Sequence, residues 1–94
     1  MNKTIVITRH EALVEYLREQ GMIDDSTTVM SHVTHEDVIG KDVIGVLPLS
    51  LAAEANSVTE IPLRLTPEMR GQELSLETLR QIAGKPVKYK VEVL

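Results

Sequence analysis

The tripeptide Thr8, Arg9 and His10 has the clearest potential for chemistry in this sequence. An arginine guanidinium matches phosphate oxygens, and a histidine exchanges protons near neutral pH. If a helix begins here, its free backbone N–H groups add a partial positive charge. Together these groups could hold a phosphodiester and help to cleave it without a metal. The alternative is that Thr8 caps a helix, Arg9 is solvated and His10 is an ordinary surface residue.

Two further histidines, His32 and His35, could belong to a ligand site or a metal site. Glu36 and Asp37 follow them, and His with carboxylates is a set of side chains that binds metals. The residues between the histidines, 33–34, favour a strand that runs into a loop. The spacing matches no established ligand motif, so we expect a polar strand end, with neither a metal nor another cofactor. His32 is kept as a candidate ligand contact.

The predicted secondary structure alternates between strands and helices. Runs of β-branched or alternating apolar residues predict strands over 4–8, 27–33, 42–47, 58–65 and 87–94. Apolar residues at helical spacing predict helices over 10–20, 51–55 and 76–82. Buried early strands followed by alternating later strands favour a three-layer α/β sandwich with a mostly parallel sheet.

Polar residues gather where the predicted strands end. In an open α/β sheet, ligands bind outside the carboxyl ends of the strands, and this edge would carry the segments 8–10, 31–32 and 48–50. Arg70, further along the chain, could reach an anion or pair with a carboxylate such as Glu73. Arg9 and His10 are therefore the candidate catalytic residues. The candidate binding residues are Thr8, His32, Pro48, Leu49, Ser50 and Arg70.

The composition excludes several classes of protein. With 94 residues there is room for one domain, 1–94, and the absence of cysteine excludes a disulfide scaffold or a thiolate metal site. A net charge of −4 disfavours long nucleic acid as a partner. Two Tyr, with no Trp or Phe, provide no stacking platform for a single strand. The apolar N-terminal run is too short for a signal peptide or a membrane span, so we expect a cytoplasmic protein.

The chain resembles a family of small ancillary proteins of type III CRISPR systems, the Csx-sixteen family. The landmarks run nearly from end to end. They are V-I-T-R-H at 6–10, His32, G-x-D-V-I-G-x-L-P at 40–48, A-A-E at 52–54, Leu65, and R-G-x-E-L at 70–74.

This resemblance implies a Rossmann-like fold and a ring nuclease. Such proteins bind cyclic oligoadenylate, most often cyclic tetra-adenylate, and cut it into linear products, which ends the antiviral signal. The resemblance also implies a homodimer and a metal-independent attack by the ribose 2′-hydroxyl that leaves a 2′,3′-cyclic phosphate. Arg9 would then neutralise the phosphate charge, and His10 would act as acid or base or orient the phosphate.

Two other functions fit the same residues. A binding protein would sequester the cyclic oligoadenylate without cutting it, as a sponge or a sensor. A structural or regulatory dimer would have no nucleotide ligand, and the substitution Arg9→Ala would not change its function. A histidine beside an arginine at a strand–helix junction exceeds what sequestration needs, and this favours the enzyme.

Overall fold

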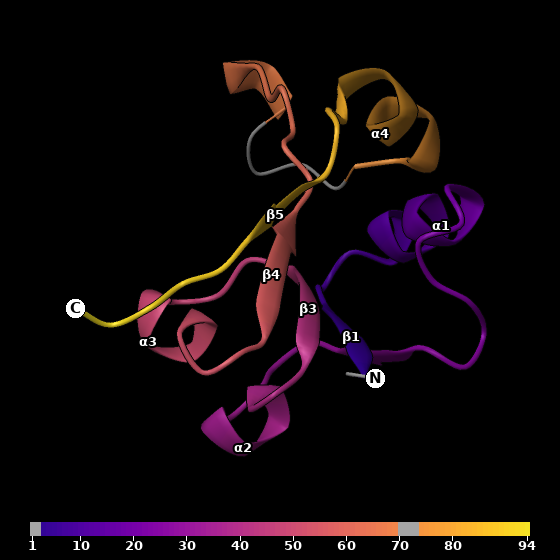
Figure 1. Ribbon diagram of the computed structural model, residues 1–94. Helices are drawn as coiled ribbons and strands as arrows, with labels where there is room; N and C mark the ends of the chain where they lie inside the picture. The colour runs from indigo at the N-terminus through magenta and orange to yellow at the C-terminus, as the bar shows by residue number, and fades with distance from the viewer. Residues whose placement is uncertain (1–2, 70–73) are drawn as a thin grey trace.

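β-Branched segments of the chain form a single twisted sheet in the computed structural model, which describes residues 3–69 and 74–94 (Figure 1). Within the described residues the strand order is β2-β1-β3-β4-β5, and only β5 runs antiparallel to its neighbour. The mostly parallel α/β sheet that the sequence predicts is therefore confirmed. The strands are β1 (Thr4–Ile7), β2 (Thr28–Met30), β3 (Asp42–Gly45), β4 (Ser57–Glu60) and β5 (Val87–Tyr89).

Helices cover both faces of the sheet. Figure 1 shows α1 and α4 on one face, and α2 and α3 on the other, which makes three layers. A short 3-10 helix, η1, lies between β4 and α4. The helices are α1 (Glu11–Glu19), α2 (His35–Val38), α3 (Leu49–Ala52), η1 (Pro67–Met69) and α4 (Leu76–Ile82).

The core lies on both faces because successive side chains of a strand point to opposite sides. On the face of α2 and α3, the strand residues Ile5, Val43 and Val58 pack with buried residues of the helices and their ends. On the face of α1, Val6 and Ile44 pack against Leu17, Ile23 and their neighbours. β1 and β3 are buried on both faces, which explains why their sequences lack an alternating pattern.

The order of the strands creates a switch point between β1 and β3. The chain passes from β1 outward to β2, then crosses back to β3 and continues in the opposite direction to β4. Ile7 and Gly45, the last residues of β1 and β3, stand opposite each other in the parallel pairing. Ligands of open α/β sheets bind in the crevice at such a point.

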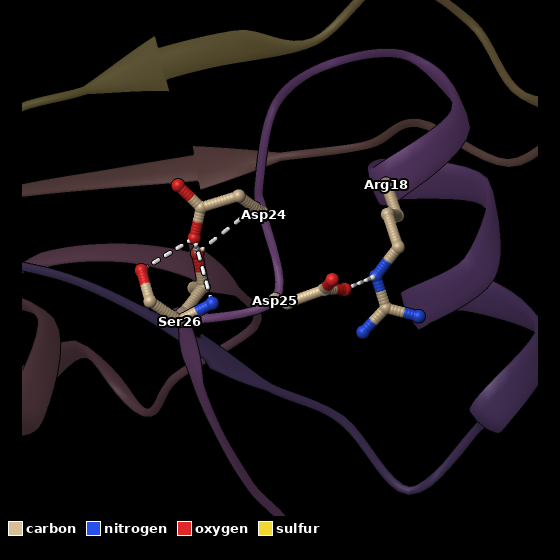
Figure 2. Close-up of polar contacts among 5 residues, drawn as sticks. Arg18, Asp24, Asp25 and Ser26 are labelled. Atoms are coloured by element: carbon tan, nitrogen blue, oxygen red, sulfur yellow. Dashed lines mark hydrogen bonds and ion pairs between the residues drawn. The ribbon is translucent and has the colours of Figure 1, made fainter.

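Local polar contacts hold the connection from α1 to β2 (Figure 2). Asp24 Oδ1 accepts hydrogen bonds from the Ser26 backbone N–H at 2.9 Å and from the Ser26 hydroxyl at 2.6 Å. These bonds lower the pKa of Asp24. Arg18 Nε lies 3.3 Å from Asp25 Oδ1. Hydrogen bonds to the short side chain of Asp24 thus stabilise the turn in this loop, as they do in Asx turns.

An ion pair joins the two helices of one face. Arg80 on α4 donates from Nε to both carboxylate oxygens of Glu19 on α1, at 3.0 Å each. The hydrogen bond from Arg80 is the main reason that the pKa of Glu19 is lowered. This partly exposed pair links α4 to α1.

Helix α2 was not expected from the sequence. The predicted strand over 27–33 was wrong in its second half, because β2 ends at Met30 and α2 begins at His35. Thr34 is the N-cap residue, and the Asp37 carboxylate accepts from its backbone N–H at 2.7 Å. A threonine followed three residues later by an acidic residue is a signature of a helix start, and the sequence carries this signal.

The predicted strands over 58–65 and 87–94 are shorter in the structure. β4 ends at Glu60, because Pro62 has no N–H to donate to a sheet ladder. The chain after it pairs instead with the end of α4: Arg64 N donates to Ile82 O at 3.0 Å, and Gly84 N donates to Pro62 O at 2.7 Å. β5 ends at Tyr89.

Asp42, at the start of β3, is expected to make stability depend on pH. Its Oδ1 accepts hydrogen bonds from Asn56 Nδ2 at 2.6 Å and from Ser57 Oγ at 2.7 Å, and these bonds lower its pKa. A lowered pKa stabilises the fold above the unfolded value, and this stability is lost as pH falls through the folded value. We expect Asp42→Ala to cost about 1 kcal/mol at pH 7.

The measurement is urea unfolding at pH 7 and at several acidic pH values. The loss of stability on acidification should be smaller in Asp42→Ala than in the wild type. Glu92→Gln, a change at an exposed carboxylate outside these contacts, is the control and should keep the wild-type pH dependence. Parallel pH curves for the wild type and Asp42→Ala would contradict the role assigned to this carboxylate.

Candidate functional site

A pocket with a volume of about 350 Å³ opens at the switch point between the carboxyl ends of β1 and β3. We call it the switch-point pocket. It lies on the face of the sheet that α1 covers. Its lining residues are Ile7, Thr8, Arg9, His10, Leu13, Ser31, Ile44, Gly45, Val46, Ile61 and Leu63. The tripeptide singled out in the sequence therefore lies at the place where this fold binds ligands.

Local hydrogen bonds place the tripeptide between β1 and α1. Thr8 N donates to Met30 O at 3.0 Å, which ties the end of β1 to the end of β2. The Thr8 hydroxyl accepts from His10 N at 3.1 Å. His10 has an extended backbone and is the N-cap residue of α1. Thr8 thus shapes the turn, and His10 stands directly at the start of the helix.

Arg9 brings one positive charge to this turn, next to Glu11 in the first turn of α1, although the whole chain is acidic. Among residues 3–69 and 74–94, no carboxylate lies within ion-pair distance of Arg9. In the same described residues, the backbone N–H groups of Glu11 and Ala12 have no acceptor. An exposed guanidinium beside the unsatisfied N–H groups of a nine-residue helix is suited to an anion such as a phosphate.

Most of the remaining lining of the pocket is apolar, and we call it the apolar wall. Leu13 comes from α1 and Ile44 from β3, while Ile61 and Leu63 come from the segment that leaves the sheet after β4. Val46 stands at the rim with 75% of its surface exposed. A pocket with apolar walls and a few converging polar groups is typical of small-molecule sites. It could hold a heterocyclic ring against the apolar wall and a phosphate at the turn.

Gly45 allows the two strand ends to lie close together. Its φ is +146°, and a Cβ at this position would collide with the carbonyl oxygen of Ile7. Residues with a side chain rarely adopt such a backbone conformation. Gly45 therefore permits close packing of β1 and β3 at this end of the sheet.

The other candidate residues do not line the switch-point pocket. His32 is exposed and follows Ser31, which does line it. Pro48 is the N-cap residue of α3, and Ser50 is an exposed residue of that helix. Leu49 lines a different pocket, on the other face of the sheet. Arg70 lies outside the described residues.

His35 is part of α2 and not of the pocket. Its Nδ1 lies 3.9 Å from Glu54 Oε1, next to α3. In the described part of the chain, no three His, Asp or Glu side chains lie together as possible metal ligands.

Sequence reasoning missed the apolar wall. Ile61 and Leu63 alternate with their neighbours as the residues of a strand do, which hid their departure from the sheet. The signal that could have found them is Pro62, because a proline ends pairing in the interior of a sheet.

Comparison with known families gives one match. The family model described as "Putative CRISPR-associated protein (Cas_VVA1548)" matches residues 5–92, nearly the whole chain. No curated protein and no solved structure gives a significant match. Among the described residues, no helix combines the length and the apolar composition needed to cross a membrane.

Proposed function

Because the chain belongs to this family of CRISPR-associated proteins, we propose that it is a ring nuclease of type III CRISPR immunity. Its substrate is cyclic tetra-adenylate, and its linear products end in a 2′,3′-cyclic phosphate. Cleavage of cyclic tetra-adenylate switches the antiviral signal off. The observation that carries the proposal is the switch-point pocket, where Arg9 and His10 stand at the start of α1 and share the lining with an apolar wall.

The proposed reaction uses the substrate's own nucleophile. A ribose 2′-hydroxyl attacks the adjacent phosphorus, and a new P–O bond forms while the P–O5′ bond breaks. The 2′-hydroxyl loses its proton and the leaving 5′-oxygen gains one. Arg9 and the N–H groups at the start of α1 stabilise the charge on the phosphorane. His10 exchanges one of the protons or orients the phosphate, and holding the 2′-oxygen in line supplies much of the rate.

The proposal includes a homodimer. A cyclic tetranucleotide can have two-fold symmetry, and a two-fold dimer presents the same patch twice. Two copies of the switch-point pocket would then face one ring, with two nucleotides for each protomer. This arrangement agrees with the small size of the chain, which gains stability from association.

The experiment that tests the activity is a cleavage assay without metal. The protein is incubated with cyclic tetra-adenylate in EDTA, and the products are resolved by chromatography. We expect the wild type to cut the ring, and His10→Ala to be about 100-fold slower. Since His10 is exposed, the variant should fold normally.

The outcomes separate the proposed enzyme from the other functions. An intact ring that elutes with the protein would indicate a binding protein that sequesters cyclic tetra-adenylate. An intact ring that does not bind would contradict both the enzyme and the binding protein. Equal cleavage rates for the wild type and His10→Ala would contradict a catalytic role for His10.

A further inference from the structure

A second pocket, with a volume of about 280 Å³, lies on the opposite face of the sheet. We call it the β4–β5 pocket. It shares Gly45 and Val46 with the switch-point pocket, so the two pockets flank the same short segment of chain. Its lining residues are Gly45, Val46, Leu47, Leu49, Ala52, Val58, Glu60, Tyr89 and Val91.

We propose that the β4–β5 pocket binds an adenine base, stacked on the ring of Tyr89 and held at its exocyclic amino group by the Glu60 carboxylate. Aromatic side chains stack on bases of any kind. A carboxylate accepts hydrogen bonds from an exocyclic amino group, such as those that adenine and cytosine carry. Tyr89 is one of two aromatic residues in the chain, and it lines this pocket.

The pairing of β4 and β5 brings Tyr89 and Glu60 to one face. Tyr89 stands directly opposite Val58, whose side chain packs in the core beneath α2 and α3. Glu60 lies two residues after Val58 on the same strand and therefore points to the same side. Tyr89 and Glu60 are diagonal neighbours in the sheet, at a separation that long side chains bridge.

Exposed apolar surface completes the walls of the pocket. Val46 and Leu49 expose 75% and 76% of their surface, and Tyr89 exposes 47%. A flat heterocycle lying on the tyrosine ring would cover part of this surface, and burial of apolar area stabilises the complex.

The negative charge of Glu60 determines which part of a nucleotide binds in the β4–β5 pocket. Among the described residues, the Glu60 carboxylate has no ion pair. A carboxylate repels phosphate and attracts an amino group, so the base enters here and the phosphate stays on the side of Arg9. If the proposed function is right, adjacent nucleotides of one ring place their bases on either side of the Gly45–Val46 segment.

The experiment uses the two tyrosines as internal probe and control. In protein with 13C-labelled tyrosine, the ring signals belong to Tyr16 on α1 and Tyr89 on β5. Tyr16→Phe assigns them. AMP and IMP, which differ by the 6-amino group, are titrated separately. We expect AMP to shift the Tyr89 ring signals and to leave those of Tyr16 unchanged, and IMP to bind about tenfold more weakly.

A matched pair of variants tests the amino-group contact. Glu60→Gln should remove the preference for AMP over IMP, because a glutamine amide can both accept and donate. Glu92→Gln, which changes an exposed carboxylate outside the pocket lining, should keep the preference.

The titration tests the base site separately from the ring nuclease. Tyr89 signals that ignore AMP, or that respond equally to AMP and IMP, would overturn the base site even if the wild type cuts the ring. Tyr89 signals that depend on protein concentration instead of AMP would show that a second copy covers the pocket, which also overturns it. A selective response to AMP in a protein that leaves the ring intact would uphold the base site and overturn the nuclease.

Discussion

Arg9→Ala is expected to slow the cleavage of cyclic tetra-adenylate by about 1,000-fold. The guanidinium is exposed at the switch-point pocket, and no carboxylate of the described residues pairs with it. Its charge is therefore available to the phosphorane, where loss of one preorganised donor has its largest effect. Single-turnover cleavage in EDTA measures the change.

Two further variants sharpen this prediction. Arg9→Lys keeps the charge but loses the planar fork that matches phosphate oxygens, so it should recover only part of the rate. Arg18→Ala changes an arginine near the far end of α1 that pairs with Asp25, and it should leave cleavage unchanged. Equal rates for the wild type and Arg9→Ala would show that the phosphate does not bind at the start of α1.

Gly45→Ala is expected to destabilise the fold by about 3 kcal/mol, or roughly 15 °C in Tm. The new Cβ would collide with the Ile7 carbonyl oxygen, and a φ of +146° is unfavourable for alanine. The collision can be relieved only if β1 and β3 separate at their carboxyl ends, which is where the switch-point pocket opens. Thermal unfolding measures the change.

Gly40→Ala is the matched control for the collision. Gly40 also has a positive φ, +68°, but a Cβ there would meet no atom within 4 Å. Its cost should be about 1 kcal/mol, because only the backbone conformation is unfavourable. Similar melting temperatures for Gly40→Ala and Gly45→Ala would show that the strand ends can separate without cost.

Much of the sheet could be predicted from the sequence because its strands are either continuous apolar runs or alternating runs of β-branched residues. The run that contains Ile5 and Val6 reads as a strand buried on both faces, and the polar turn after it follows directly. To predict that Arg9 lies at the ligand-binding edge of the sheet, it was therefore enough to recognise the first strand and the start of the next helix.

Other parts of the site depend on contacts between distant segments. The alternating pattern around Ile61 does not reveal that the chain leaves the sheet after Glu60 and turns back over the switch-point pocket. The approach of Tyr89 to Glu60 depends on which strand pairs with β5, and alternation within one strand does not specify its partner.

The mass of the first product tests the central claim most directly. Wild-type protein is incubated with cyclic tetra-adenylate in EDTA, and the products are separated from the ring by chromatography and then analysed by mass spectrometry, with the 2′-deoxy ring as the control. Separation is needed because the product of one 2′-hydroxyl attack is an isomer of the ring. We predict linear oligoadenylate ending in a 2′,3′-cyclic phosphate, and no cleavage of the 2′-deoxy ring. Cleavage of the 2′-deoxy ring, or a first product that has gained a water molecule, would contradict attack by the 2′-hydroxyl at this site.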